Sequence, residues 1–200
     1  MCRTWFTRTH WITWGAVLYL LTSPLILHFF DPAPPSPNAE NVSFLSSDYV
    51  EYWSAWRILR GAQALYDPLP MLAVQNALVP PGQSEHLRTE ALMMWNPPWL
   101  LYIIGPVLTL PFASSFIAWL GLNILLLLLS ARLLQLSIPN RAPKFWAILA
   151  AMFLFHPVWF SLKYGQLGCL LTFGCALLIY GLTAGCFLTQ GVALLILSTK

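Results

Sequence analysis

The sequence contains very little charge. Only 8% of its 200 residues are charged, whereas soluble domains carry about 25%. All seven acidic residues lie between Asp31 and Glu90, so the remainder of the chain after Glu90 contains none. The net charge of +3 is too small and too scattered to indicate binding to nucleic acid. Because 58% of the residues are hydrophobic, a lipid bilayer is the solvent that fits the composition best.

The sequence also lacks the usual patterns of metal, redox and nucleotide sites. Its four histidines are dispersed without paired spacing, and its four cysteines form no CxxC pair. Its glycines have neither the spacing nor the strand context of a loop that binds phosphate. We therefore expect no metal ion and no cofactor, and we expect the cysteines to be buried and unreactive.

Long apolar runs predict an all-α fold, a polytopic transmembrane helical bundle. Residues 11–30 carry no formal charge and are long enough to span a bilayer. Two arginines in residues 1–10 favour a cytoplasmic N-terminus. A cleaved signal peptide is the alternative, but its apolar core of about 7–15 residues would be shorter. Residues 91–200 contain the further apolar runs, at 95–112, 114–136, 145–162, 167–188 and 191–200.

The run at 95–112 leaves two topologies open. If it spans the membrane, Arg132, Arg141 and Lys144 lie outside, against the positive-inside tendency. If it is re-entrant, these charges lie inside, but its backbone then needs cover from protein or a water-filled cavity. The run at 191–200 is only half a span, so we expect the chain to be the front part of a larger polytopic protein.

The acidic residues gather in a polar segment, residues 31–90, which we expect to lie outside the cytoplasm. Within this segment, residues 48–60 form a predicted helix that Gly61 would end in a left-handed conformation. Four aromatic residues of this helix fall within one arc of about 100°: Tyr49, Tyr52, Trp53 and Trp56. An aromatic arc of this kind suits a helix at the membrane–water interface.

Asp48 begins this predicted helix beside the aromatic arc, and two interpretations apply to it. It is a candidate general base, because a carboxylate can remove the proton that makes a hydroxyl a poor nucleophile. It also forms a capping-box-like pair with Glu51, three residues later, and the residue types alone favour this structural role. Asp67 precedes a proline and is expected to be a turn residue.

Several other polar residues are candidates for binding. Arg57, Arg60 and Arg88 suit an anionic lipid phosphate, or are charges that extend to solvent. Arg60 ranks first because it lies beside the aromatic arc. Gln166, in the "KYGQ" turn, is a candidate for binding sugar hydroxyls or for bridging two helices.

Four features occur in a fixed order. The first loop reads "DYVEYWSAWRILRGAQALYDP", with an Asp-aromatic start, a Gly and a Tyr-Asp; "WNPPWLLYIIGPVLTLPF" follows, with Asn-Pro-Pro, and "KYGQLGCLLTFGCALLIYGL" comes later, with Gly-Gln. Together with the span that precedes them, these motifs resemble the polyprenol-phosphate-mannose-dependent mannosyltransferases of bacteria, which are multi-spanning C-superfamily glycosyltransferases. The resemblance covers roughly residues 11–190. One departure is Leu167, which stands where the family has Asn after Gly-Gln.

The resemblance implies a function. It implies transfer of a hexose, with mannose as the family's sugar, from a polyprenyl-phosphate-linked donor to a glycan or glycolipid acceptor, with inversion at the sugar carbon. The reaction would take place at the extracytoplasmic face of a bacterial inner membrane, with membrane lipids around the spans. Asp48 matches the family's proposed general base. The candidates for substrate binding are Glu51, Tyr52, Trp53, Trp56, Arg60, Tyr66 and Gln166.

A non-catalytic polytopic protein, such as a transporter or permease subunit, is the alternative. Such a protein would place ionisable residues within its spans, near broken helices. Here the acidic residues lie in a loop, which favours the enzyme.

Overall fold

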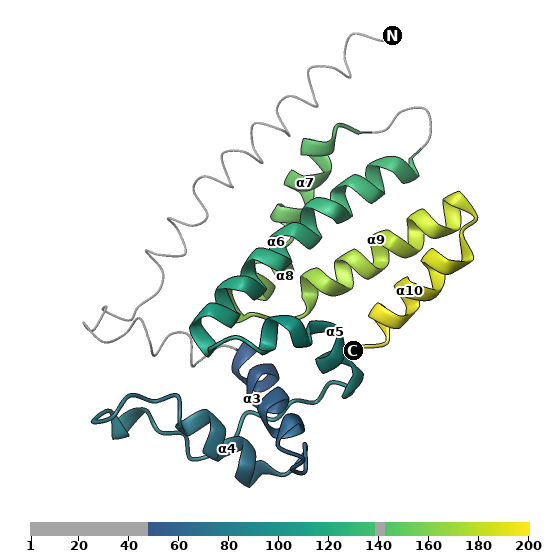
Figure 1. Cartoon of the computed structure of the whole chain (residues 1–200). Coiled ribbons are helices and arrows are strands. Elements are labelled where there is room, and N and C mark those ends of the chain that lie inside the picture. Colours follow the sequence, from purple (N-terminus) through teal and green to yellow (C-terminus); the bar gives the residue numbers. More distant parts are fainter. Residues whose placement is uncertain (1–47, 139–142) are drawn as a thin grey trace, which may run out of the picture. The chain divides into compact units, whose positions relative to one another are not determined.

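The computed structural model describes residues 48–138 and 143–200. The predicted span at 11–30 and its cytoplasmic flank lie outside the described residues. Every regular element in the described residues is a helix, which confirms the all-α prediction (Figure 1). The described residues form two units, one of 48–123, 161–167 and 198–200, the other of 124–138, 143–160 and 168–197.

The first unit is built around α3 (Tyr49–Arg60), which packs against α4 (Pro68–Asn76) and α5 (Trp99–Leu108) (Figure 1). The predicted helix at 48–60 is therefore confirmed. The sequence did not predict α4, which begins at Asp67, the N-cap residue, whose carboxylate accepts a hydrogen bond of 3.0 Å from the Leu69 backbone N–H. Asp67 thus has the structural role expected of it.

The end of α3 differs from the prediction in one residue. Gly61 ends the helix, but its φ is −81°, and the left-handed residue is Ala62, with φ of 53°. The N–H of Gln63 donates to the Ile58 carbonyl and the N–H of Ala62 to the Leu59 carbonyl. These are the two hydrogen bonds of a Schellman motif. The residue that adopts the strained left-handed conformation in this motif is Ala62.

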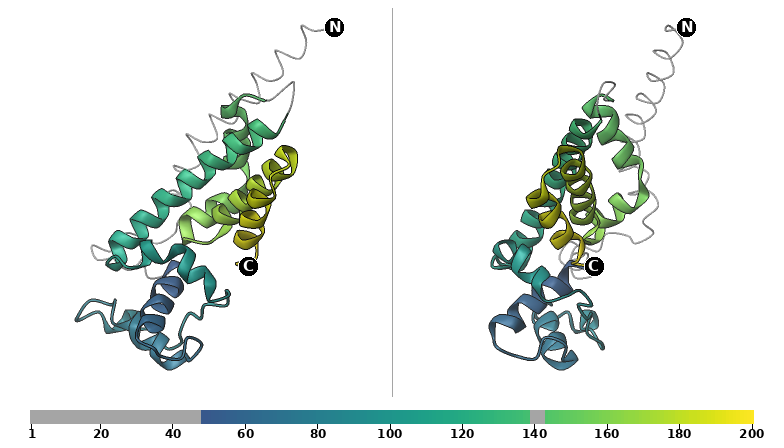
Figure 2. Two further views of the ribbon diagram at one scale, coloured as in Figure 1. Left: turned by 45° about the vertical axis from the view of Figure 1, so that its right-hand side comes forward. Right: turned by 90° about the vertical axis from the view of Figure 1, so that its right-hand side faces the viewer.

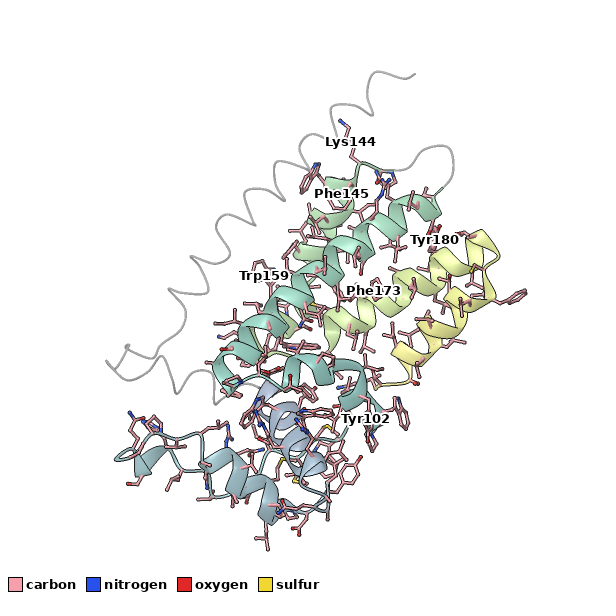
Figure 3. The ribbon with its side chains drawn as sticks, viewed as in Figure 1. Tyr102, Lys144, Phe145, Trp159, Phe173 and Tyr180 are labelled. Atoms are coloured by element: carbon pink, nitrogen blue, oxygen red, sulfur yellow. The ribbon has the colours of Figure 1, made fainter. Side chains whose placement is uncertain are left out.

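The aromatic arc of α3 packs against protein, so the prediction that it seats the helix in lipid headgroups is wrong. Tyr49, Tyr52 and Trp53 are buried, and only Trp56 is partly exposed. The Trp56 ring meets that of Tyr102 of α5 edge-on, with centroids 6.2 Å apart; Tyr102 is labelled in Figure 3. The arc therefore forms the core of the first unit.

Two adjacent amides of α4 hold the segment that returns toward α5. The Gln75 amide donates to the Leu92 carbonyl at 2.8 Å and accepts from the Leu92 N–H at 3.0 Å. The Asn76 amide makes the same pair of hydrogen bonds with the backbone of Arg88, at 3.1 and 2.8 Å. A short 3-10 helix, Ser84–His86, lies between α4 and the segment 88–92 that these amides bind. We call these four hydrogen bonds the amide clasp.

One helix of the described chain, α6 (Phe112–Ser137), is long and apolar enough to cross a membrane. It confirms the predicted run at 114–136. In contrast, α5 has ten residues and is about 15 Å long, half the thickness of a bilayer core. This length favours the re-entrant alternative for residues 95–112.

The predicted span at 145–162 is broken. It consists of α7 (Phe145–Leu154) and α8 (His156–Tyr164), which are bent by 73° relative to each other. The bend falls at Phe155, and Pro157 occupies the first turn of α8, where its missing N–H has no helical partner to lose. If this pair counts as one span, the described residues contain two membrane-capable elements.

The second unit ends in a helical hairpin of α9 (Gly168–Ala184) and α10 (Phe187–Leu197), which lie side by side in every view (Figures 1 and 2). Gly181 of α9 allows the close approach, because a Cβ there would lie 3.1 Å from the backbone nitrogen of Gln190. Cys169 of α9 is buried as expected, but Cys175 is exposed, contrary to the prediction of buried cysteines.

Candidate functional site

Asp48 is the N-cap residue of α3, but its side chain makes no capping hydrogen bond. Its Oδ2 instead accepts a hydrogen bond of 2.5 Å from Nε2 of Gln166, 118 residues later in the chain. The interpretation of Asp48 and Glu51 as a capping-box pair is therefore wrong. The side chain of Asp48 is partly exposed, and it is held by a tertiary contact.

Gln166 reaches Asp48 because the turn that carries it is docked on α3 and α6. Gly165 ends α8 with φ of 69°, and the Gln166 N–H donates to the Ser161 carbonyl at 3.0 Å. A Cβ on Gly165 would lie only 2.6 Å from the Cβ of Tyr49. Both the conformation and the close contact require glycine at this position.

Tyr49 connects the turn that carries Gln166 to α6. Its hydroxyl lies 2.6 Å from Oγ of Ser115 and 3.2 Å from the Ser115 carbonyl oxygen, and Oγ of Ser115 lies 2.9 Å from the Val107 carbonyl oxygen. Burial raises the pKa of Tyr49 above its ordinary value, which keeps this hydroxyl protonated. The Trp119 ring stacks on Tyr49 with centroids 5.8 Å apart, and its Nε1 donates to the Gly165 carbonyl at 2.9 Å.

Glu51 lies one turn into α3 and has different surroundings from Asp48. Burial raises the pKa of Glu51 to about 7, and the negative charge of Asp48 adds to the increase. A hydrogen bond with Tyr52 and the positive charge of Lys200 act in the opposite direction. Burial also raises the pKa of Tyr52, so the tyrosine hydroxyl donates and the Glu51 carboxylate accepts.

Of the two arginines on α3, the one that contacts the aromatic residues is Arg57. Its guanidinium lies 4.6 Å from the centre of the Trp53 ring, and it donates to the Leu110 carbonyl at 3.3 Å. Trp53 donates to the same carbonyl at 3.0 Å. Arg57 and Trp53 therefore donate hydrogen bonds just beyond the C-terminal end of α5, where the helix dipole favours a positive charge. Arg60, which the sequence ranked first, is exposed in the last turn of α3.

The structure does not bring all the predicted site residues together. Asp48 and Arg60 lie at opposite ends of α3, about 18 Å apart along its axis. Tyr66 follows the C-terminal end of α3, and its hydroxyl donates to the Asn96 carbonyl at 3.4 Å. The group that the structure assembles at the N-terminal end of α3 is therefore Asp48, Gln166 and the buried residues that support them.

Sequence reasoning missed two of those supporting residues, Ser115 and Trp119. Both lie in a long apolar run, and no local pattern in that run indicates a contact with Tyr49 of α3. Across residues 48–138 and 143–200, no group of three or more His, Cys, Asp or Glu side chains is placed to hold a metal ion.

The comparison with protein families identifies the chain. The model of glycosyltransferase family 87 matches residues 95–199, just over half of the chain. The match includes the Gly165–Gln166 turn and all of α6, whereas α3 lies outside it. No curated protein and no solved structure matches this chain significantly. Because the matched region covers more than half of its length, the chain belongs to glycosyltransferase family 87, whose members are membrane-associated.

Proposed function

We propose that this protein transfers a hexose, with mannose as the first candidate, from a polyprenyl-phosphate donor to an acceptor hydroxyl, and that Asp48 is the general base. The observation that carries the proposal is the state of the Asp48 side chain, which caps no helix and is held by Gln166. A carboxylate fixed by one oxygen keeps the lone pairs of its other oxygen for a substrate hydroxyl. Family membership supports the transfer of a sugar.

The proposed reaction is a single displacement. The free oxygen of Asp48 takes the proton of the acceptor hydroxyl while the acceptor oxygen forms a bond to C1 of the sugar. The bond between C1 and the phosphate oxygen breaks, and its electron pair stays on the polyprenyl phosphate that leaves. Attack opposite the leaving group inverts the configuration at C1. Arg60 lies about 18 Å from Asp48 along the axis of α3, so we assign it no part in binding the leaving phosphate.

We also propose that Asp48 faces the extracytoplasmic side of a bacterial inner membrane. Ser115, which supports the site, lies near the first turn of α6, and Arg132 lies about 26 Å further along the same helix. That separation is close to the thickness of the bilayer core. Because Arg132 lies toward the far end of α6 and Lys144 follows this helix in the sequence, the positive-inside tendency favours the cytoplasm for that end of α6 and the outside for its first turn.

The test is the Asp48→Asn variant, expressed in membranes and assayed with polyprenyl-phosphate-mannose and an acceptor glycolipid. Asparagine preserves the size of the side chain but cannot take a proton. We expect transfer to fall by about 10²- to 10⁴-fold, the usual contribution of a general base.

Asp67→Asn is the matched control. It makes the same chemical change in the same polar segment, and its amide oxygen can still accept from the Leu69 N–H. Its activity should remain near that of the wild type. Full transfer by Asp48→Asn at normal expression would contradict the assignment of Asp48 as the base.

A further inference from the structure

We propose that Gln166 is a positioning residue for Asp48, which holds one oxygen of the carboxylate so that the other is directed at the acceptor. This inference rests on the proposed function, because it concerns the same carboxylate. Gln166 would therefore act through Asp48 and make no direct contact with the sugar.

The chemistry of the contact determines which way the amide faces. An ionised carboxylate can only accept hydrogen bonds, so Gln166 must present its NH₂ group to Asp48. This orientation uses a donor of Gln166 that would otherwise be available to a sugar hydroxyl. It also occupies Oδ2 of Asp48, so Oδ1 is the oxygen that we assign to the substrate.

A contact between the chain neighbours of Asp48 and Gln166 holds the two residues near each other. Tyr49 follows Asp48 in the chain and Gly165 precedes Gln166, and these two neighbours pack directly against each other. The Trp119 indole ties the Gly165 carbonyl to α6 and stacks on Tyr49. The backbones next to Asp48 and Gln166 are therefore both held by buried aromatic residues, on either side of the hydrogen bond.

A positioning role predicts a specific kinetic pattern. A misdirected base lowers kcat, because the acceptor hydroxyl still binds but loses its proton less readily. A ligand of the sugar would instead raise KM when removed. A residue that acts only through Asp48 also has nothing left to contribute once the carboxylate is gone, so the two losses should not add.

The experiment measures kcat and KM for the donor in membranes that contain Gln166→Leu or Gln166→Glu. Leucine removes the donor group, and glutamate keeps the shape but replaces the donor with a second carboxylate. We expect each variant to lower kcat by about 10- to 100-fold, the size of effect that a small displacement of a catalytic group produces, with little change in KM. Gln63→Leu and Gln63→Glu are the controls, because Gln63 is exposed beyond the end of α3.

The same substitutions are then made in the Asp48→Asn background, where we expect no further loss. Wild-type kcat in Gln166→Glu, a raised KM, or a full additional loss in the double variants would each overturn the inference. These outcomes leave the base assignment intact if Asp48→Asn alone is inactive. An active Asp48→Asn would instead overturn the base assignment itself, so the two failures can be distinguished. Thermal unfolding in detergent shows whether each variant folds, and Gln166→Glu remains the informative variant if Gln166→Leu does not.

Discussion

Glu51 and Asp48 are carboxylates three residues apart on one helix, yet they are suited to different tasks. Asp48 is partly exposed and bonded to an amide from a distant turn. Glu51 is paired with the hydroxyl of its neighbour Tyr52, and burial raises its pKa to about 7. A carboxyl group with a pKa near neutrality gains or loses its proton within the physiological range, so Glu51 makes the stability of this end of α3 sensitive to pH.

We predict that Glu51 stabilises the folded protein in acid and loses this contribution as the pH rises. Its pKa is raised in the folded state, so the folded protein binds the proton more tightly than the unfolded chain does. The contribution is therefore fully present below about pH 4.5 and is lost as the pH rises through about 7. Thermal unfolding of detergent-solubilised protein, followed across this range, measures the effect.

Glu51→Gln removes the titrating group and keeps a similar shape, so its unfolding temperature should vary less over the same range. Asp48 and Lys200, the charges that act on Glu51, remain in this variant. Identical pH profiles for the variant and the wild type would show that Glu51 does not titrate in this window.

At the scale of elements, two helices end in the same way but in different surroundings. Gly165 ends α8 with φ of 69°, and Gly185 ends α9 with φ of 66°. A Cβ at Gly185 would meet nothing within 4 Å, whereas one at Gly165 would lie 2.6 Å from the Cβ of Tyr49. The pair separates the cost of the left-handed backbone from the cost of the close contact.

We predict that Gly165→Ala destabilises the protein more than Gly185→Ala does. Both substitutions incur about 1–2 kcal/mol for a side chain in the left-handed region. Only Gly165→Ala adds an overpacking cost, about 1–3 kcal/mol, and it should also reduce transfer because the turn carries Gln166. Denaturant unfolding in detergent and the transfer assay measure the two effects. Equal destabilisation by the two variants would mean that the contact with Tyr49 adds no overpacking cost at position 165.

How well the sequence predicted each element depended on whether its signal was local. The aromatic spacing identified α3, and an uninterrupted apolar run identified α6. The break between α7 and α8 had a local signal in Pro157, which the apolar composition of the run outweighed. In the same way, the Asp-Pro dipeptide at Asp67 indicated a turn but not the helix that follows it.

The candidate site was predicted only in part, for a physical reason. Asp48 and Gln166 were each identified as polar residues in unusual positions, but the hydrogen bond between them spans 118 residues. Periodicity describes contacts within one element and carries no information about such a pair. The same limit explains the burial of the aromatic arc, because its spacing fits either a lipid surface or the surface of another helix.

At the scale of the whole molecule, charge is distributed along the chain in a way that fits one orientation. The acidic residues precede α5, and the basic residues Arg132, Arg141 and Lys144 follow far along α6 or after it. In the described residues, α6 is the first helix after the polar segment that is long and apolar enough to cross a membrane.

We predict that residues 63 and 144 lie on opposite sides of the membrane. In a chain whose native cysteines are replaced, Gln63→Cys should react with an impermeant maleimide in right-side-out vesicles. Lys144→Cys should react only after permeabilisation, because the positive-inside tendency holds this end in the cytoplasm. Both side chains are exposed in the structure, so burial does not explain a difference. Labelling of Lys144→Cys in sealed vesicles would contradict the predicted orientation, because it would place residue 144 outside the cytoplasm.

The amide clasp places an unusual constraint on variation in this protein. The amides of Gln75 and Asn76 bind backbone atoms of Leu92 and Arg88, so these four hydrogen bonds use no side-chain atom of those two residues. The number of residues between positions 88 and 92 cannot change, because two adjacent amides on α4 bind backbone groups that are four residues apart. Point substitutions other than proline in residues 88–92 should therefore preserve the hydrogen bonds of the clasp, whereas the insertion or deletion of a single residue would leave one amide without its partner.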